Sequence, residues 1–343
     1  MTNAFPPNQQ FLLAARPVGL PRREDWLFHE QAVPEPGEGD VVVKVLYLSL
    51  DPAMRGWMNE GRSYIRPVAI GEVMRAGGLG VVIASRSDRF AVGDHVMGST
   101  GVQRYWCGAA DDPHAGLGKI DPRVGHLTAW LNVLGMPGMT AYFGLREVGQ
   151  PKPGETVVVS GAAGAVGMTV GQVARQMGCR VVGIAGGEEK CDFVVARLGF
   201  DACIDYKAGE VGAALRTHCP QGVDVYFDNV GGEILDAVLT RINLRARIVL
   251  CGAISQYNAA GPVKGPANYL SLLVNRARME GMIVFDYAAR YPEAVAQLGK
   301  WLAAGALQSH EHVVEGFEQF PQALLMLFEG RNLGKLVLKV ADA

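Results

Sequence analysis

Residues 157–167 read Val-Val-Val-Ser-Gly-Ala-Ala-Gly-Ala-Val-Gly, a β-branched run that leads into a glycine-rich turn. Such a run, followed by an amphipathic segment, is typical of a strand, turn and helix that bind the phosphates of a dinucleotide. We expect Val157–Val159 to form a buried parallel strand, Gly164 to let the backbone approach a pyrophosphate, and Gly167 to let the next helix pack against the sheet. Ala162 replaces the first glycine of the usual Gly-x-Gly-x-x-Gly spacing, so a glycine turn without a ligand is the alternative.

The residues after the turn favour the ligand. Apolar residues recur there at helical spacing and a glycine follows them, as at the end of a helix: Val166, Val170, Val173, Ala174, Met177 and Gly178. A second strand is expected at Arg180–Ile184. Strand, glycine turn, helix and second strand together form the first unit of a dinucleotide-binding fold.

The tip of this second strand, at Ala185 and Gly186, lacks the acid that an NAD-specific site carries for the ribose 2′-hydroxyl. Lys190 follows closely, and its cation suits the 2′-phosphate of NADP. The alternatives are that Glu188 or Glu189 serves NAD, or that Lys190 is a solvated surface residue. We interpret both glutamates as residues of a helix's first turn, where the helix dipole favours them, and expect NADP.

Strands and helical patterns alternate through this half of the chain, which predicts a doubly wound parallel sheet. Beyond the first two strands, at 156–160 and 180–184, we expect four more at Ala202–Asp205, Val223–Asp228, Arg247–Cys251 and Glu280–Val284. The loops at the carboxyl ends of such strands hold the ligand.

The first part of the chain differs in kind. Strand-like runs at Gly39–Leu50, Gly80–Ser85 and His95–Gly98 are separated by turns rich in proline and glycine. Near the end, an amphipathic segment at Pro321–Phe328 precedes a short strand at Leu336–Val340, which needs a sheet to join. We therefore expect residues 1–131 to form a β-rich domain, residues 132–310 the dinucleotide-binding domain, and residues 311–343 to return to the first domain.

Composition agrees with a protein of two domains. The chain has 343 residues, of which 49% are hydrophobic and 19% charged, and its net charge of −2 offers no field for nucleic acid or an anionic membrane. The uncharged run Thr156–Ala174 has the length of a membrane span but contains the glycine turn. The start of the chain lacks the pattern of a signal peptide, so we expect a cytoplasmic protein that binds neither nucleic acid nor membrane.

No metal site is expected. The six cysteines form no Cys-x-x-Cys pair, and no cysteine lies beside the close pair His310 and His312, which we do not expect to bind metal.

Five motifs, in order, resemble the zinc-independent group of the medium-chain dehydrogenase/reductase superfamily, which includes prostaglandin reductases, alkenal/one oxidoreductases and curcumin reductases. They are Leu-Ser-Leu-Asp-Pro-Ala-Met-Arg-Gly at 48–56, Met-Pro-Gly-Met-Thr-Ala-Tyr-Phe-Gly at 136–144, Tyr-Phe-Asp-Asn-Val-Gly-Gly-Glu at 226–233, Cys-Gly-Ala-Ile-Ser-Gln-Tyr-Asn at 251–258 and Asn-Leu-Gly-Lys at 332–335. The segment Ile70–Gly80 is most similar to the curcumin reductase branch, whereas Ala53 stands where many relatives carry tyrosine. The resemblance implies an α/β fold in which a doubly wound Rossmann sheet is joined to a β-rich, GroES-like catalytic domain.

The resemblance also implies the chemistry. The zinc-dependent branch places ligands where this chain has Tyr47–Asp51 and Ile70–Val73, neither of which offers cysteine or histidine, and the structural zinc loop is missing. Without a Lewis acid, direct reduction of a carbonyl is difficult, whereas an alkene conjugated to a carbonyl accepts hydride at its β carbon and leaves an enolate. By resemblance, the hydroxyl of Tyr257 stabilises this enolate together with the nicotinamide ribose. The alternative is that Tyr257 only packs on the cofactor.

Further site residues are carried over from matching positions. Tyr64 is expected to line the substrate pocket, with an exposed loop tyrosine as the alternative, and Thr140 to approach the nicotinamide. The expected NADP(H) contacts are Thr140, Gly164, Ala165, Val166, Gly167, Lys190, Tyr206, Asn229, Cys251, Gly252, Ala253, Ile254, Ser255, Gln256, Tyr257, Met282, Ile283, Val284 and Asn332.

The sequence therefore predicts an NADPH-dependent reductase of the carbon–carbon double bond in α,β-unsaturated ketones and aldehydes. An NADPH-dependent quinone reductase of the same superfamily and a non-catalytic NADPH-sensing protein are the alternatives. A homodimer is expected, because the last strand of the Rossmann sheet would otherwise be an exposed apolar edge.

Overall fold

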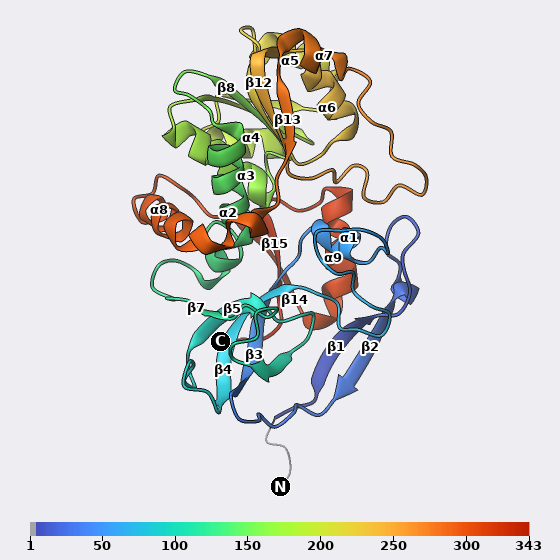
Figure 1. Cartoon of the computed structure of the whole chain (residues 1–343), viewed down its shortest axis with the longest axis vertical. Coiled ribbons are helices and arrows are strands. Elements are labelled where there is room, and N and C mark those ends of the chain that lie inside the picture. The colour runs from blue at the N-terminus through green and yellow to red at the C-terminus, as the bar shows by residue number, and fades with distance from the viewer. Residues whose placement is uncertain (1–4, 343) are drawn as a thin grey trace. The chain divides into compact units, whose positions relative to one another are not determined.

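A parallel sheet of six strands carries the glycine-rich turn (Figure 1). Its strands are β8 (Thr156–Ser160), β9 (Arg180–Ala185), β10 (Ala202–Asp205), β11 (Val223–Asp228), β12 (Ile242–Leu250) and β13 (Arg278–Gly281), in the spatial order β10-β9-β8-β11-β12-β13. All five neighbouring pairs are parallel. The strand order reverses between β8 and β11, where the chain returns from the β10 edge to the centre. The predicted doubly wound sheet is thus confirmed, and ligands of such sheets bind at this reversal point.

Helices connect the strands. They are α2 (Met136–Phe143), which continues as a π-helical segment over Gly144–Gly149, α3 (Ala165–Gln176), α4 (Glu188–Ala196), α5 (Val211–His218), α6 (Gly232–Leu239), α7 (Leu270–Asn275) and α8 (Tyr291–Ala303), preceded by a 3₁₀ segment at Val284–Arg290. Leu215 of α5 and Val238 of α6 are buried in one cluster with Val158, Tyr226 and Ile248 of the sheet. The predicted helix after the glycine turn is α3, and Gly178 follows it with φ of +78°.

Two predicted strands differ in extent. The expected strand at Arg247–Cys251 begins earlier, at Ile242, and ends at Leu250, so Cys251 lies in the loop. The expected strand at Glu280–Val284 is wrong in its position, because β13 runs over Arg278–Gly281 and its pairing with β12 ends at Leu250 and Gly281. After Gly281 the chain leaves the sheet and continues into the 3₁₀ segment that begins at Val284.

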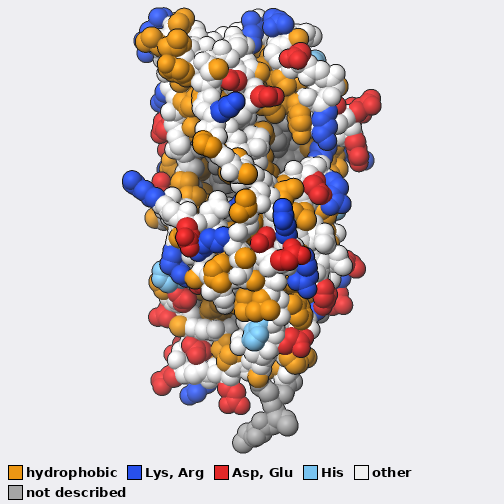
Figure 2. Space-filling model, turned by 90° about the vertical axis from the view of Figure 1, so that its right-hand side faces the viewer, with side chains coloured by type: hydrophobic (Ala, Val, Ile, Leu, Met, Phe, Trp, Pro, Cys, Tyr) orange, Lys and Arg blue, Asp and Glu red, His pale blue; other side chains and the backbone are white. Residues whose placement is uncertain are grey.

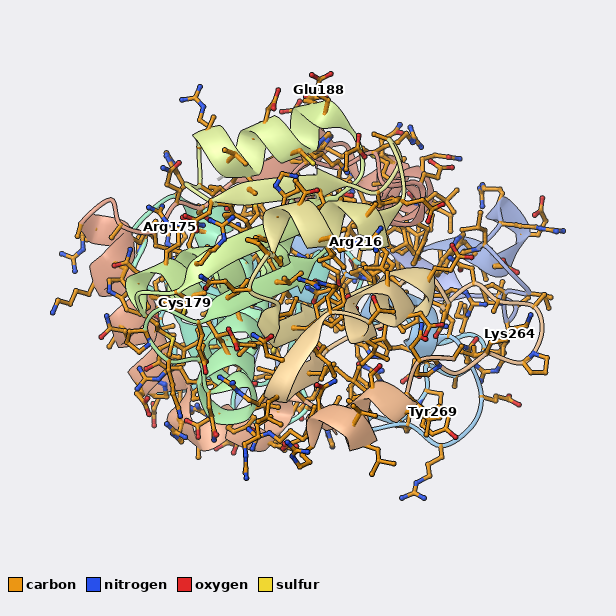
Figure 3. The ribbon with its side chains drawn as sticks, turned by 90° about the horizontal axis from the view of Figure 1, so that it is seen from above. Arg175, Cys179, Glu188, Arg216, Lys264 and Tyr269 are labelled. Carbon is orange, nitrogen blue, oxygen red and sulfur yellow. The ribbon has the colours of Figure 1, made fainter. Side chains whose placement is uncertain are left out.

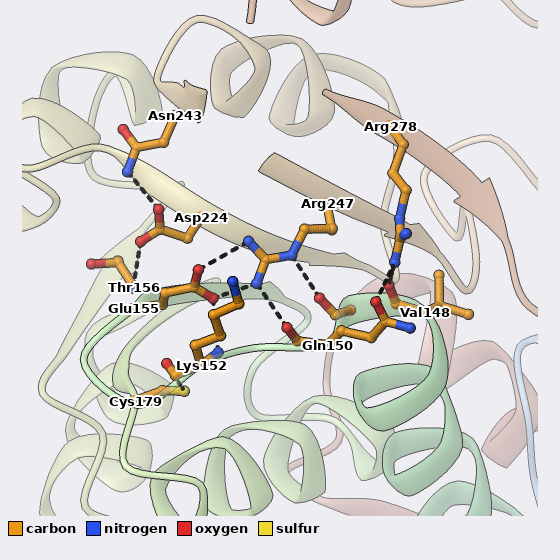
Figure 4. Close-up of polar contacts among 11 residues, drawn as sticks. Val148, Gln150, Lys152, Glu155, Thr156, Cys179, Asp224, Asn243, Arg247 and Arg278 are labelled. Atoms are coloured by element: carbon orange, nitrogen blue, oxygen red, sulfur yellow. Dashed lines mark hydrogen bonds and ion pairs between the residues drawn. The ribbon is translucent and has the colours of Figure 1, made fainter. Parts of the chain in front are cut away.

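Side chains at the amino ends of the strands form a polar network (Figure 4). Arg247 donates hydrogen bonds to the carbonyl oxygens of Gly149 and Gln150, each at 2.9 Å, and forms an ion pair with Glu155. Asp224 accepts hydrogen bonds from the Thr156 amide and from Asn243, each at 2.8 Å. These contacts tie the amino ends of β8, β11 and β12 together, so the opposite, carboxyl edge is the one whose loops remain for a ligand.

The structure is a computed structural model that describes residues 5–342, and its contacts divide the chain into two compact units. Asn132–His310 forms the unit with the parallel sheet, and the residues up to Leu131 form the other unit together with those from Glu311 onward. Among the described residues, no helix combines the length and apolar character needed to cross a membrane. The long uncharged run Thr156–Ala174 is divided between β8 and α3.

The other unit is rich in β structure, as predicted. Its strands are β1 (Asn8–Leu13), β2 (Trp26–Gln31), β3 (Asp40–Ser49), β4 (Gly77–Ser85), β5 (His95–Ser99), β6 (Tyr105–Ala109), β7 (Gly118–Lys119), β14 (Glu311–Glu315) and β15 (Lys335–Lys339), and its helices are α1 (Ala53–Trp57) and α9 (Phe320–Glu329). Short 3₁₀ segments lie at Arg23–Asp25, Leu127–Leu131 and Phe317–Gln319.

Seven of these strands form one sheet, with the order β14-β15-β3-β4-β5-β7 and with β6 paired to β3. The terminal strand β15 pairs antiparallel with β3, so that Val337 lies opposite Ser49. Beside it, Leu48, Met54, Phe317 and Phe320 pack in one buried cluster. Strands from the first part of the chain and from its last part thus contribute to the same sheet and core.

Candidate functional site

The glycine-rich turn requires glycine at Gly167. A Cβ atom built there would lie 2.2 Å from the carbonyl oxygen of Gly161, which is backbone and has no side-chain freedom to move away. At Gly164, which caps the N-terminus of α3, a Cβ atom would lie 3.2 Å from the same oxygen. The α3 helix therefore starts tightly against the end of β8. Its first N–H groups, at Ala165 and Val166, have no preceding carbonyl within the helix and can bind an anion.

Asn229 lies directly against this turn, from the other side of the reversal point. Its side-chain amide donates a hydrogen bond to the carbonyl oxygen of Ser160 at 2.7 Å, and its backbone N–H donates to the Ser160 hydroxyl at 2.9 Å. The Cβ atom of Asn229 is 3.5 Å from the position that a Cβ atom of Gly161 would occupy. The structure therefore brings the glycine-rich turn after β8, which holds the predicted pyrophosphate contacts, together with the predicted contact Asn229 after β11.

Asp228, the last residue of β11, organises this edge from inside and was missed as a site residue by the sequence reasoning. One of its carboxylate oxygens accepts four hydrogen bonds, from the hydroxyls of Ser160 and Tyr226 at 3.0 and 2.8 Å and from the amides of Val230 and Gly231 at 3.0 and 2.9 Å. The other oxygen is buried and has no hydrogen-bond partner among residues 5–342. The signal available in the sequence was a charged residue at the end of an apolar strand.

The loop after β12 contains seven of the predicted contacts, Cys251–Tyr257. It is bonded to the loop after β11: the Cys251 and Gly252 amides donate to the Asp228 carbonyl oxygen at 2.9 and 3.0 Å, and the Ile254 amide donates to that of Asn229 at 3.2 Å. The Tyr257 side chain folds back over the loop, and its hydroxyl accepts a hydrogen bond from the Ala253 amide at 3.1 Å. The predicted catalytic hydroxyl thus lies at the carboxyl edge of the sheet.

Burial raises the pKa of the Cys251 thiol to about 12, and the nearby Asp228 charge acts in the same direction. The thiol therefore stays protonated at neutral pH, so Cys251 is no nucleophile in this loop. Burial also raises the pKa of the Tyr226 phenol, which keeps it a hydrogen-bond donor to Asp228.

The tips of β9 and β10 hold the residues predicted for the adenosine end. The Tyr206 hydroxyl lies 2.7 Å from the position that a Cβ atom of Gly186 would occupy, so the missing side chain makes room for the ring. Asp205 accepts hydrogen bonds from the amides of Gly187 and Lys207 at 2.8 and 2.9 Å, which joins the two tips. These bonds lower the pKa of the Asp205 carboxyl.

Lys190 lies in the first turns of α4, next to a second cation. Glu188 and Glu189 occupy the first turn of this helix, as predicted, and Glu188 is labelled in Figure 3. Burial lowers the pKa of the Lys190 ammonium, the positive charge of Lys207 lowers it further, and Glu189 acts in the opposite direction. Lys207 was missed by the sequence reasoning, because only the contact between the tips of β9 and β10 brings it near Lys190.

The remaining predicted contacts of this unit are mostly packed into its core. Met282 and Val284 are buried, and the Val284 carbonyl oxygen accepts a hydrogen bond from the Tyr291 hydroxyl at 3.1 Å. Ile283, between them, is partly buried. The Thr140 hydroxyl donates to the Met136 carbonyl oxygen at 2.8 Å, one turn earlier in α2.

Two predicted site residues belong to the β-rich unit. The Asn332 side chain donates a hydrogen bond to the Gly334 carbonyl oxygen at 2.8 Å, which closes the turn before β15. Tyr64 is 51% exposed, and its hydroxyl accepts a hydrogen bond from the indole N–H of Trp57 at 3.1 Å. Their roles toward cofactor and substrate stay predictions.

The described residues contain no group of three or more histidine, cysteine or acidic side chains that is arranged to hold a metal ion. In Tyr47–Asp51, one of the segments where the zinc-dependent branch places ligands, Asp51 accepts hydrogen bonds from Ser49 at 2.5 Å and from the Lys335 ammonium at 2.6 Å.

Known protein families match both units. A family model described as an N-terminal domain of oxidoreductase matches residues 9–115, and one described as a zinc-binding dehydrogenase matches residues 165–300. The chain is 43% identical to the NADPH-dependent curcumin reductase of Escherichia coli, over 97% of each chain. It is 44% identical to the NADP⁺-dependent 2-alkenal reductase of Nicotiana tabacum, over 97% of this chain and 98% of the relative.

A solved structure agrees with these matches. The structure of CurA from Vibrio vulnificus in complex with NADPH is similar, with a TM-score of 0.92 and 44% sequence identity. The alignment covers 98% of this chain and 100% of the CurA chain. The similarity therefore includes both units.

Proposed function

Because this chain belongs to the zinc-independent group of the medium-chain dehydrogenase/reductase superfamily, we propose that it reduces the carbon–carbon double bond of α,β-unsaturated ketones and aldehydes with NADPH. A 2-alkenal is by its name an aldehyde with a conjugated double bond, and curcumin also carries alkenes conjugated to carbonyls. The observation that carries the proposal is the position of the Tyr257 hydroxyl, held by the Ala253 amide in the loop that follows β12. A fixed phenol at this edge of the sheet suits an oxyanion that forms during the reaction.

The unit Asn132–His310 fits a dinucleotide with a 2′-phosphate. Gly164 and Gly167 place no side chain at their own positions in the turn, and the first amides of α3 are available for a pyrophosphate. At the adenosine end, Lys190 lies near Lys207, whose positive charge disfavours the charged form of Lys190. A phosphate dianion between them would relieve this repulsion, which supports NADPH rather than NADH as the cofactor.

When bound, NADPH supplies a hydride to the β carbon of the substrate. The role of the chain's own residues is then to orient the substrate and to stabilise the charge that moves onto its carbonyl oxygen. We assign the Tyr257 hydroxyl as a hydrogen-bond donor to that enolate oxygen. The double bond's two carbons take up one hydride and one proton, so the carbonyl is regenerated when the α carbon is protonated.

At the substrate end, we propose that Tyr64 lines the pocket together with Trp57. The Arg75 guanidinium lies 5.5 Å from the centre of the Trp57 ring, and Trp57 in turn bonds the Tyr64 hydroxyl. One guanidinium nitrogen of Arg75 is buried without a hydrogen-bond partner in the described part of the chain. Aromatic surface beside a cation suits substrates with rings or long conjugated systems.

An assay panel with enals, enones and quinones tests the proposal. With an enone and NADPH deuterated on the transferred face, we expect a saturated ketone labelled at the β carbon and no allylic alcohol. Label on the carbonyl carbon would show a carbonyl reductase instead. Turnover of quinones alone would identify a quinone reductase, and binding of NADPH without oxidation by any of these substrates would identify a binding protein.

We further propose a homodimer, joined near the β13 edge of the sheet. β13 itself carries the charged residues Arg278 and Glu280, so the expectation that this edge strand is apolar is wrong. The apolar surface lies instead on the adjacent helix α7, where Leu273 and Val274 are 74% and 69% exposed. Figure 2 shows hydrophobic side chains gathered at the top of its view, and α7 lies at the top of Figure 1.

Exposed neighbouring apolar side chains of this kind are usually covered by a partner, and a second copy presents the same surface. Light scattering at micromolar concentration is expected to give the mass of a dimer. Leu273→Asp is expected to yield a monomer, while the control Val92→Asp, at a residue that is 66% exposed in the other unit, is expected to keep the dimer. A monomeric wild type would disprove this assembly.

We propose the cytoplasm as the site of action. All six cysteines are free thiols, which suits a reducing compartment. Cell fractionation that finds the protein outside the cytoplasm would contradict the assignment.

A further inference from the structure

The side chain of Tyr257 closes a small ring with its own loop. Its hydroxyl accepts a hydrogen bond from the Ala253 amide at 3.1 Å, four residues earlier. The Gln256 amide donates to the Ala253 carbonyl oxygen at 2.8 Å, which makes the turn that brings Tyr257 back. The phenolic oxygen therefore has a position that is set by main-chain geometry.

That main chain is itself held in place by the loop after β11. The Gly252 amide donates to the Asp228 carbonyl oxygen at 3.0 Å, and the Ile254 amide donates to the Asn229 carbonyl oxygen at 3.2 Å. The amides on both sides of Ala253 are therefore anchored. Displacing Ala253 would break bonds to a neighbouring strand end. A change in the position of the Tyr257 hydroxyl must therefore come from pressure on the side chain rather than from movement of the loop.

Gly252 is where such pressure would arise. A Cβ atom at this residue would lie 3.0 Å from the Tyr257 hydroxyl oxygen and 3.3 Å from the Asn229 carbonyl oxygen. The φ angle of Gly252 is not in the left-handed region, so the backbone itself would accept alanine. Glycine at residue 252 is therefore needed for space and not for backbone conformation, and the atom nearest to that space is the phenolic oxygen of Tyr257.

We infer that Gly252 is a positioning residue for Tyr257: its missing side chain allows the hydroxyl to reach the Ala253 amide and so fixes the donor for the enolate oxygen. The inference rests on the proposed function for its catalytic meaning. A methyl group at residue 252 would displace the phenolic oxygen by a few tenths of an ångström from the position in which it accepts the Ala253 hydrogen bond. A misplacement of about 1 Å in an active site costs roughly a hundredfold in rate, so this smaller shift is expected to cost about three- to tenfold in kcat.

A double-mutant cycle tests the coupling. Gly252→Ala is expected to lower kcat for an enone by about three- to tenfold in the wild-type background and by less than about twofold in Tyr257→Phe, where the obstructing oxygen is gone. Because Gly252 is also one of the predicted NADP(H) contacts, kcat is compared at saturating NADPH, and any change in the Kd for NADPH on Gly252→Ala is expected to be equal in the two backgrounds. Gly209→Ala is the matched control, because a Cβ atom there meets nothing within 4 Å. An equal loss of kcat in both backgrounds would overturn the inference.

A second measurement does not depend on turnover. In protein labelled with 3-fluorotyrosine, the ¹⁹F resonance that disappears in Tyr257→Phe belongs to Tyr257, and Gly252→Ala is expected to shift it while Gly209→Ala does not. An unshifted resonance would overturn the inference, whatever the reaction. If the wild type reduces no enone, the proposed function fails and the ¹⁹F shift alone decides on the contact. If Gly252→Ala cannot fold in either background, the obstacle is the Asn229 carbonyl and the inference is wrong.

Discussion

The ammonium nitrogen of Lys335 lies 2.6 Å from a carboxylate oxygen of Asp51, and its side chain is only 1% exposed. The same ammonium donates a hydrogen bond to the Leu50 carbonyl oxygen at 2.8 Å. Lys335 begins β15, and Asp51 follows β3, so this ion pair joins the end of the chain to the strand beside it. Two of the motifs that resemble the family, at 48–56 and 332–335, are therefore two halves of one contact.

Removing either partner of this pair is expected to destabilise the fold, but unequally. Asp51→Ala leaves a buried ammonium without its counter-charge and is expected to cost about 3–5 kcal/mol. Lys335→Met leaves the Asp51 carboxyl without its cation but 30% exposed and still bonded to Ser49, and is expected to cost about 1.5–3 kcal/mol. Urea unfolding of both variants measures the difference, with Lys339→Met, at a more exposed ion pair, as control. A smaller cost for Asp51→Ala than for Lys335→Met would contradict this account.

Features set by neighbouring residues could be predicted from the sequence, and the glycine turn shows why. The run Val157–Val159, the turn and the helix after Gly164 are each specified by local pattern, and the structure has them at the expected places. By contrast, β1 has its polar residues Asn8 and Gln10 buried, because both bond the Gln103 side chain. From its sequence, such a strand is predicted to be half exposed, because the distant partner Gln103 is not evident from the pattern.

In the candidate site, too, residues within a local motif could be predicted, whereas residues whose role depends on distant contacts could not. Tyr257 and Asn229 were predicted from motifs, and the structure places both at the carboxyl edge of the sheet. Asp228 and Lys207 were not, because the importance of each depends on a contact between the ends of different strands. The fold-back of Tyr257 onto Ala253 likewise depends on the path of the loop, which no spacing of residues reveals.

The two glycines of the turn are expected to respond differently to alanine. At Gly167 a Cβ atom would lie 2.2 Å from backbone, so Gly167→Ala is expected to destabilise the Rossmann unit by several kcal/mol or to prevent folding. At Gly164 the distance is 3.2 Å, and Gly164→Ala is expected to fold but to bind NADPH about tenfold more weakly, because the methyl group obstructs the phosphate. Thermal unfolding and NADPH fluorescence measure the two effects. Equal stability of both variants would show that the close contact with the Gly161 carbonyl oxygen does not determine the stability of Gly167→Ala.

Turnover is expected to need no metal. The segments Tyr47–Asp51 and Ile70–Val73 offer no cysteine or histidine, and Asp51 is engaged by Lys335. Exhaustive treatment with a chelator should therefore leave the rate of enone reduction unchanged. Metal analysis that finds one zinc per chain, with activity lost on its removal and restored on its return, would contradict both this prediction and the proposed mechanism.

Lys190 is expected to select the cofactor. A charge-assisted contact to the 2′-phosphate contributes about 1.5–3 kcal/mol, so Lys190→Ala should lose roughly ten- to a hundredfold in kcat/KM with NADPH and change little with NADH. Lys300→Ala, at a lysine in α8, is a matched control for removing one cation from the same unit. Equal efficiency of the wild type with the two cofactors would refute the assignment.

The same lysine is expected to make NADPH affinity depend on pH. Burial and the charge of Lys207 lower the pKa of Lys190 below 10.5, the ordinary value for lysine, so the ammonium is lost earlier as pH rises and its contact with the 2′-phosphate is lost with it. The Kd for NADPH should therefore increase with pH before an ordinary lysine would titrate, whereas that for NADH should not. Lys207→Gln removes the repulsion and is expected to move the increase to higher pH, although it weakens binding at every pH. Measurements from pH 7 to 10 decide the point: the same alkaline increase in Lys190→Ala would show that another group titrates.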